Sequence, residues 1–191
     1  MRVTTNRTVQ AMLLGLLLLL PTSHAQEPLN VTEVQPAAEQ GHARSQVALG
    51  IMYYLGQGGA QYYKQAAAWY GKAAGQGDTD AQRFLGDLYY LGKGVPQDYK
   101  QAAAWFRKAA EQGHATAQFL LGGVHYTGQG VPQDYLQAYT WFSVAAANGE
   151  PDSPIGRDAV AALLSPQQLE SAQKTAAEYF EKHQPKTSKS R

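Results

Sequence analysis

The residues that could do chemistry in this sequence are a serine and a lysine near the C-terminus. Ser171 and Lys174 have the S-x-x-K spacing of an acylating serine and its lysine in penicillin-interacting enzymes, and 186–188 loosely matches the K-T-G element that accompanies it. No S-D-N element lies between them, and Lys174 and Lys186 are only 12 residues apart. The pattern therefore does not favour a β-lactam-directed enzyme.

Other candidate chemical groups are equally isolated. The lysine of Gly92-Lys93-Gly94 lacks the glycine spacing and the following Ser or Thr of a phosphate-binding loop. His42 and His114 occupy one position of a repeat, two repeats apart, which favours a role at helix starts over shared metal binding. His125 replaces a tyrosine of the other repeats, and His183 lies near a predicted helix end. We expect no catalytic residue, no metal and no cofactor, and hence no enzyme.

Composition narrows the class of protein. The chain has 191 residues, a formal net charge of +1 and no cysteine. The balanced charge argues against nucleic-acid binding, and the lack of cysteine excludes disulfides, thiolate metal sites and a cysteine nucleophile. The length suits one domain. Abundant alanine with few β-branched residues favours helices over sheets.

The N-terminus is typical of an export signal. Arg2 and Arg7 precede an apolar run over 11–20, which Pro21 ends, and Ser23-His24-Ala25 supplies small residues at the two positions that signal peptidase recognises. Ten helical residues rise about 15 Å, too short for a hydrocarbon core of about 30 Å. We expect a signal peptide over 1–25, cleaved after Ala25, and a periplasmic or secreted protein without stable membrane insertion.

A tandem repeat dominates the rest of the chain. The blocks 39–74, 75–110 and 111–146 align without gaps; the first and second agree at 21 of 36 positions, and the second and third at 20. Trp69, Trp105 and Trp141 recur at this 36-residue spacing, as do glycines and tyrosines. Such a period is typical of repeat architectures in which neighbouring units share one core.

Each block predicts two helices joined by a glycine-rich turn. In the second block the apolar spacing predicts a helix over 79–91 and a second helix from Asp98 to just before Gly113, with Asp98 and Gln101 in capping-box spacing. Tyr62 replaces that aspartate in the first block and predicts a poorer cap. Gly50, Gly86 and Gly122 should allow close helix approach. The predicted fold is all-α, a right-handed α-solenoid of stacked helical hairpins.

The ends of the solenoid should be capped. Residues 26–38 predict a linker and a short capping helix that resembles a second helix of the repeat. Residues 147–183 predict a degenerate repeat, with a helix over 158–164, followed by a capping helix that starts at Ser165-Pro166 and runs to about His183. The basic segment 184–191 is predicted to be disordered.

The repeat resembles a known family. The pattern from Ala81 onward, Ala-x3-Leu-Gly-x2-Tyr-Tyr-x-Gly-x-Gly-Val-Pro-Gln-Asp-Tyr-x-Gln-Ala-x2-Trp-Phe, is similar to Sel1-like repeats, relatives of the tetratricopeptide repeat. The resemblance covers about 39–146. It implies a non-enzymatic adaptor, often secreted or periplasmic, that holds other proteins on a concave face. A cysteine-rich branch of such proteins has been linked to penicillin binding or β-lactamase activity, but this chain has none of its cysteines.

Exposed positions that vary between repeats are candidates for ligand binding. A helical wheel places three positions on one side of the first helix of each repeat, two that vary and one that is always tyrosine. The candidate binding residues at these positions are Val47, Ile51, Tyr54, Arg83, Asp87, Tyr90, Phe119 and Tyr126, and Gly123 stands at the equivalent position of Ile51 and Asp87. The tyrosines could equally serve only to cover the neighbouring helix. A face about 30 Å long would hold about nine extended residues, which favours a protein or peptide partner.

Two alternative functions remain at this point. One is a cell-wall or β-lactam-directed hydrolase. The other is an assembly factor that uses the opposite, convex face, including Lys72 and Lys108. The sequence does not define the partner or the oligomeric state.

Overall fold

The computed structural model describes residues 31–56 and 62–182. The chain divides into two units, 1–30 and 31–191, and all described residues belong to the second. The expected signal peptide over 1–25, the loop that contains Gly59 and Ala60, the end of the last helix at His183 and the basic tail over 184–191 lie outside the described residues.

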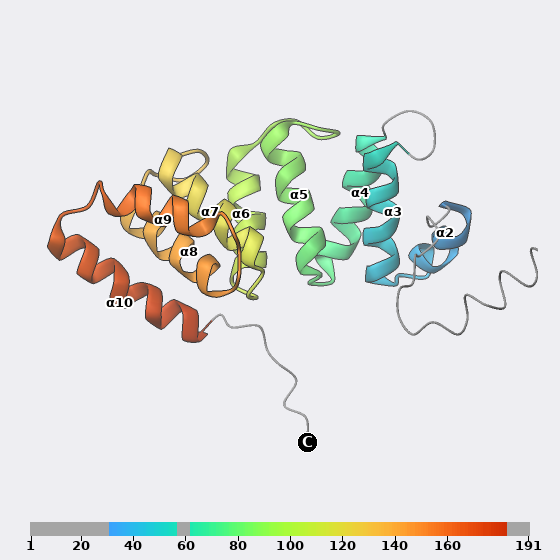
Figure 1. Ribbon diagram of the computed structural model, residues 1–191. Coiled ribbons are helices and arrows are strands. Elements are labelled where there is room, and N and C mark those ends of the chain that lie inside the picture. The colour runs from blue at the N-terminus through green and yellow to red at the C-terminus, as the bar shows by residue number, and fades with distance from the viewer. Residues whose placement is uncertain (1–30, 57–61, 183–191) are drawn as a thin grey trace, which may run out of the picture. The chain divides into compact units, whose positions relative to one another are not determined.

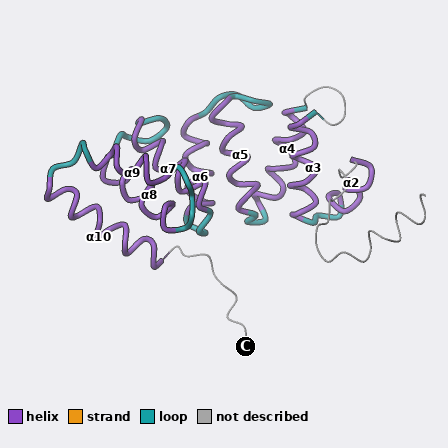
Figure 2. The backbone as a smooth tube through the Cα atoms, in the orientation of Figure 1, coloured by secondary structure: helices purple, strands orange, loops and turns teal. Residues whose placement is uncertain are grey.

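Helices and short connections make up the described part of the chain, which contains no strand (Figures 1 and 2). From α2 to α9 each helix packs against its neighbours in the sequence, whereas α10 returns to pack against α8. We refer to the first and second helix of each repeat as helix A and helix B. In chain order the helices are α2 (Val31–Glu39), α3 (Ala43–Leu55), α4 (Tyr63–Gly75), α5 (Thr79–Leu91), α6 (Tyr99–Ala110), α7 (Ala115–Thr127), α8 (Tyr135–Ala147), α9 (Ser153–Ala161) and α10 (Pro166–Lys182).

The helix boundaries follow from capping residues. The Asp98 and Asp134 carboxylates accept hydrogen bonds from the backbone N–H groups three residues later, so they start α6 and α8 as the capping-box pattern predicts. Tyr62 makes no side-chain cap bond at the start of α4, as expected. The A helices α5 and α7 end at Gly92 and Gly128, which adopt the left-handed conformation that closes a helix.

The two helices of each hairpin meet at a glycine of helix A and an aromatic ring of helix B. A Cβ atom built on Gly86 would lie 2.6 Å from the Phe106 ring, and one on Gly122 would lie 2.8 Å from the Phe142 ring. Gly50 faces Tyr70 in the same way. Phe106 and Tyr70 are each only 1% exposed. The predicted packing role of these glycines is therefore confirmed.

A glutamine ladder, formed by Gln46, Gln82 and Gln118, joins successive hairpins. Each side-chain amide donates to a carbonyl of the preceding helix, that of Ala38, Ala74 or Ala110, at 3.0–3.3 Å. Each side-chain carbonyl accepts a hydrogen bond from Gln76, Gln112 or Asn148, 30 residues later, at 2.7–2.9 Å. Because the ladder residues are at most 4% exposed, these bonds satisfy polar groups that water does not reach.

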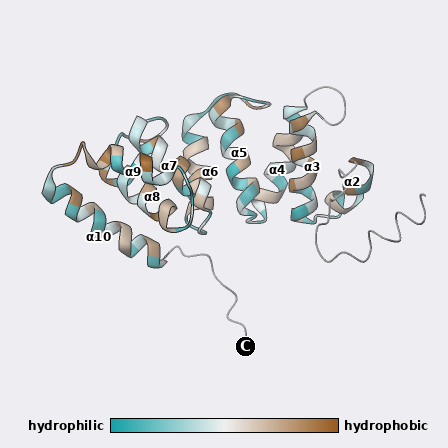
Figure 3. Cartoon of the chain, viewed as in Figure 1, coloured by the Kyte–Doolittle hydropathy of each residue, from teal (hydrophilic) through white to brown (hydrophobic). Residues whose placement is uncertain are grey.

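The C-terminal part differs in detail from expectation. Helix α9 spans Ser153–Ala161, so the predicted helix over 158–164 is placed about five residues too late; the chain turns at 150–152, and Pro154 lies in the first turn, where proline is tolerated. Helix α10 starts at Pro166, with Ser165 as its cap. It alternates polar and apolar residues (Figure 3), and its Tyr179 meets Trp141 of α8, with ring centroids 5.1 Å apart.

Candidate functional site

An apolar cavity of about 260 Å³ opens between α5 and α7, the A helices of the second and third repeats. Phe106 of α6 contributes to its wall from the intervening helix. The remaining lining residues are Asp87, Tyr90, Leu91, Phe119, Leu120, Gly123, Val124 and Thr127. The volume lies just below the range of about 300–1,000 Å³ typical of small-molecule sites, so the cavity suits one bulky side chain.

The cavity exists because Gly123 has no side chain. A Cβ built on Gly123 would have nothing within 4 Å, whereas the equivalent positions in the first and second repeats carry Ile51 and Asp87. Gly123 is also not in the left-handed conformation that would require glycine. Neither helix packing nor backbone conformation therefore requires glycine at this position, and its effect is on the shape of the surface.

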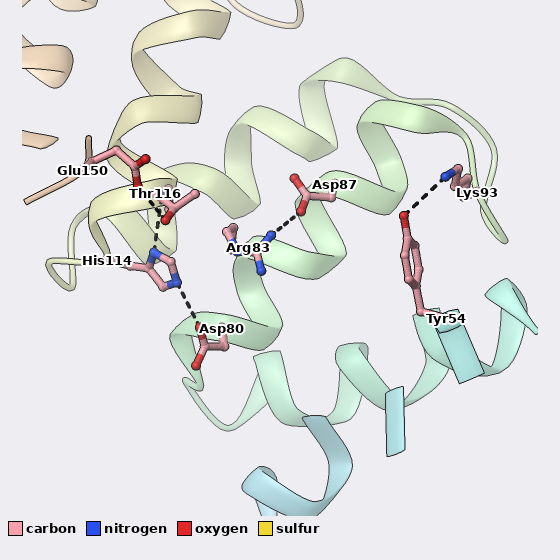
Figure 4. Close-up of polar contacts among 9 residues, drawn as sticks. Tyr54, Asp80, Arg83, Asp87, Lys93, His114, Thr116 and Glu150 are labelled. Carbon is pink, nitrogen blue, oxygen red and sulfur yellow. Dashed lines mark hydrogen bonds and ion pairs between the residues drawn. The ribbon is translucent and has the colours of Figure 1, made fainter. Parts of the chain in front are cut away.

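Asp87 is the one charged residue in the cavity lining. Its carboxylate Oδ2 accepts a hydrogen bond from Arg83 Nη1 at 2.5 Å, one turn earlier on α5 (Figure 4). Burial raises the pKa of Asp87 above its ordinary value, and the Arg83 guanidinium acts in the opposite direction. The Arg83 guanidinium lies 3.7 Å above the Phe84 ring, which fixes its position.

The structure brings some of the predicted site residues together and separates others. Asp87, Tyr90 and Phe119 line the cavity with Gly123. Val47 does not face a groove: it is 9% exposed and belongs to the core formed with α4 and α5. Ile51 is half-buried against the same core.

The three tyrosines take part in contacts within and between repeats. Tyr54, Tyr90 and Tyr126 each pair with the tyrosine nine residues later, with ring centroids 5.1–5.9 Å apart. The Tyr54 hydroxyl accepts a hydrogen bond from Lys93 at 3.3 Å (Figure 4), and the Tyr90 hydroxyl donates one to Gln129 at 2.5 Å. Both partners lie in the loop of the next repeat. Tyr126 is 41% exposed.

Sequence reasoning missed Leu91, Phe106, Leu120, Val124 and Thr127 in the cavity lining, and it named Gly123 only as the residue equivalent to Ile51 and Asp87. Leu91 and Thr127 follow the tyrosine of the repeat and close the wall at the end of each helix A. Leu91 is 50% exposed, so this apolar side chain is not required by the core. The sequence offered one indication of this site: Leu91 is an apolar residue directly before the turn glycine Gly92.

A second set of contacts joins the starts of successive A helices. His114 Nε2 lies 3.1 Å from Asp80 Oδ1, and Thr116 donates to Glu150 at 2.8 Å (Figure 4). His114 Nδ1 also accepts a hydrogen bond from the Ala117 N–H, which gives this histidine the predicted role at a helix start. Both contacts span 34 residues and tie one repeat to the next.

The groups considered for catalysis form no constellation. Ser171 and Lys174 are both exposed on α10. His125 is 7% exposed, its ring nitrogens lack hydrogen-bond partners, and burial lowers its pKa. Across 31–56 and 62–182, no three His, Asp or Glu side chains are placed to hold a metal. No helix in these same ranges is long and apolar enough to cross a membrane.

These features define an α-solenoid of helical hairpins that share one interface geometry. The Sel1 repeat family model matches residues 43–78, 79–114 and 115–150, more than half of the chain. This protein belongs to the Sel1 repeat family. The matched segments keep the 36-residue period and begin four residues later than the blocks defined from the sequence. The family is a non-catalytic scaffold family whose members generally mediate protein–protein interactions.

Solved structures of similar proteins have the same fold. The chain is 40% identical to c5321, a protective antigen of uropathogenic Escherichia coli with an SLR fold, over 81% of this chain and 33% of that one, with a TM-score of 0.77. It is 40% identical to a Sel1 repeat protein from Oxalobacter formigenes, over 69% of this chain and 98% of that one, with a TM-score of 0.61. Cysteine-rich protein B of Helicobacter pylori is 25% identical to it, over 66% of this chain and 96% of that one, with a TM-score of 0.52.

The present chain thus spans about a third of the length of the E. coli antigen. No curated protein matches the sequence.

Proposed function

We propose that this protein is a secreted or periplasmic, non-enzymatic adaptor that binds a protein or an extended peptide on its helix A face. One bulky apolar side chain of the partner enters the cavity between α5 and α7. The observation that carries this proposal is the cavity itself, an apolar hollow at a position where the repeat does not need glycine. The export part of the proposal rests on the sequence pattern over 1–25.

The lining favours an apolar anchor. Its one charged residue, Asp87, is already paired with Arg83, and the Tyr90 and Thr127 hydroxyls already bond to Gln129 and to backbone carbonyls. Few polar groups therefore remain to orient a polar ligand. Aromatic and aliphatic side chains that fill such pockets commonly supply most of the binding energy in protein interfaces.

A single substitution tests the site. Gly123→Leu should fill the cavity without a backbone clash, and it should not lower stability because leucine favours helix over glycine. Gly71→Leu on α4 is the matched control, since a Cβ there also meets nothing within 4 Å but points away from the cavity. Mature protein carrying each change is crosslinked in cells of the source organism, and the captured proteins are quantified.

A partner captured by the parent and by Gly71→Leu, but depleted at least tenfold with Gly123→Leu, supports the site. Equal capture by all three proteins would show that the binding surface does not include the cavity. Nitrocefin turnover by the purified mature chain, abolished by Ser171→Ala, would instead establish the hydrolase alternative. We expect no turnover.

A further inference from the structure

We propose that the exposed face of α4 and α6 binds an acidic segment of a partner protein, at a second site separate from the cavity between α5 and α7. We refer to this surface as the basic face, defined by Lys64 and Lys72 of α4 and by Lys100, Arg107 and Lys108 of α6. This inference does not depend on the proposed function, because it concerns the B helices of the first two repeats and a partner of different chemistry.

Charge is strongly segregated onto these two helices. The segments 31–56 and 62–182 contain more acidic than basic residues, 14 against 11. Helices α4 and α6 nevertheless carry five of the basic residues and no acidic one. All five side chains are exposed, and none forms an ion pair within the described part of the chain. Their field is therefore directed toward solvent, where it would attract an anionic partner.

Helix stability does not account for the lysines in the first turns. Lys72, Arg107 and Lys108 lie in last turns, where cations interact favourably with the helix dipole. Lys64 and Lys100 are the second residues of α4 and α6, where the positive end of the dipole disfavours a cation. They recur at the repeat spacing although they oppose local stability, which points to an interaction.

Tryptophans hold two of the cations in place. The Lys72 ammonium lies 3.7 Å from the ring centroid of Trp69, and the Lys108 ammonium lies 3.8 Å from that of Trp105. In the third repeat the positions of Lys72 and Lys108 carry Val144, which is fully buried, and Trp141 meets Tyr179 of α10. The basic face therefore lies on the two B helices other than α8, the B helix against which α10 packs.

The shape of the surface favours an acidic protein segment over a lipid surface. Lys100, Arg107 and Lys108 line a hollow of about 360 Å³ that is floored by alanines and bounded by Val131 and, at one end, Glu111. Such a hollow receives side chains, and the Arg107 guanidinium matches a carboxylate in geometry. Lys100 and Lys108 lie about 12 Å apart along the helix, the span of about four extended residues. The fitting segment carries an acid at about every fourth residue.

Fluorescence anisotropy with a labelled twelve-residue polyglutamate peptide tests the proposal at 50 mM and 300 mM salt. Lys64→Gln with Lys100→Gln should weaken binding at least fivefold, reduce its salt dependence and raise the melting temperature slightly. The matched control, Arg44→Gln with Lys174→Gln, removes the same charge from other helices, one of them again in a first turn. It should change affinity less than twofold. Lys64→Arg with Lys100→Arg should retain binding.

Circular dichroism checks that each variant remains helical. No peptide binding by the parent at 50 mM salt, or equal losses in the Lys64/Lys100 pair and the control pair, overturns the proposal. Sedimentation with vesicles of phosphatidylglycerol and phosphatidylethanolamine is the remaining arm: binding to vesicles but not to the peptide, lost in the Lys64/Lys100 variant, would assign the face to a membrane instead. Loss of peptide binding with Gly123→Leu would show that the two surfaces are not separate.

Discussion

Adding one methyl group at two helix A glycines should change stability in opposite directions. Gly86 and Gly123 both lie inside A helices with right-handed backbone conformation. A Cβ on Gly86 would lie 2.6 and 2.7 Å from two ring atoms of Phe106 and 3.3 Å from the Ala102 carbonyl oxygen, while one on Gly123 meets open space. Phe106 is 1% exposed, so an added methyl group would have to displace a buried ring that also borders the cavity between α5 and α7.

The magnitudes follow from these contacts. Alanine gains about 1 kcal/mol over glycine in a helix interior, and this gain applies at both sites. Overpacking a core costs about 1–3 kcal/mol, and contacts under 3 Å with a buried ring, beside a backbone oxygen at 3.3 Å, belong to the upper part of that range. Gly86→Ala should therefore lower the free energy of unfolding by about 1–2 kcal/mol, and Gly123→Ala should raise it by about 1 kcal/mol.

Thermal unfolding followed by circular dichroism measures the difference. At about 2–4 °C per kcal/mol for a domain of this size, Gly86→Ala should melt about 2–8 °C lower than the parent and Gly123→Ala about 2–4 °C higher. Urea unfolding provides the same comparison at one temperature. If both variants shifted in the same direction by similar amounts, close contact between glycine and ring would not be what sets the hairpin geometry.

Three further predictions concern buried and shared side chains. Because burial lowers the pKa of His125, the folded protein binds fewer protons than the unfolded chain below about pH 6.5, so stability should fall as the pH drops through that value. His125→Tyr should show a smaller loss in melting temperature between pH 7.5 and 5.5; an equal loss would place the acid sensitivity elsewhere. Gln118→Leu removes two hydrogen bonds and leaves the Asn148 side-chain amide without its partner, while the Ala110 carbonyl keeps its bond from the Gly113 N–H, so the free energy of unfolding in urea should fall by about 1–3 kcal/mol; a neutral result would mean that the glutamine ladder contributes nothing. Tyr90→Phe should lower the free energy of unfolding by about 0.5–1.5 kcal/mol, because it removes the hydrogen bond from the Tyr90 hydroxyl to Gln129 in the next loop. Tyr126→Phe should lower it by less, and equal effects of the two changes in thermal melts would contradict a role of Tyr90 in joining repeats.

The repeat made most of the fold predictable. Helix boundaries in the second block follow from residues whose conformational preference is local, such as Asp98 as a cap and Gly92 as a terminator. The pattern was repeated three times, so each copy supported the others. Helix α9 was misplaced because its repeat is degenerate and the turn before it, at 150–152, has no glycine.

The candidate site was predictable only in part. A helical wheel identifies one face of helix A, but it does not show which neighbours cover that face. Val47 is buried in the core that α3 forms with α4 and α5, whereas Asp87 lines a cavity beside the glycine that stands at its equivalent position in the next helix A. The glutamine ladder repeats as regularly as the tryptophans. Its hydrogen bonds join residues 8 and 30 positions apart, a relation that only the packed hairpins reveal.

The loop contacts between repeats have a consequence for how this chain could lengthen. Gly94 and Gly130 both have positive φ, and a Cβ on either would collide with the backbone of the preceding helix B, at Tyr63 or Tyr99. Each loop thus fits a surface that every complete repeat offers to its successor. Duplication of residues 79–114 would insert a unit whose two boundaries already match their neighbours, so a longer array could arise in one genetic event without new compensating substitutions. Insertions within the repeats that are not a whole number of 36-residue units would misalign these loops and should be selected against.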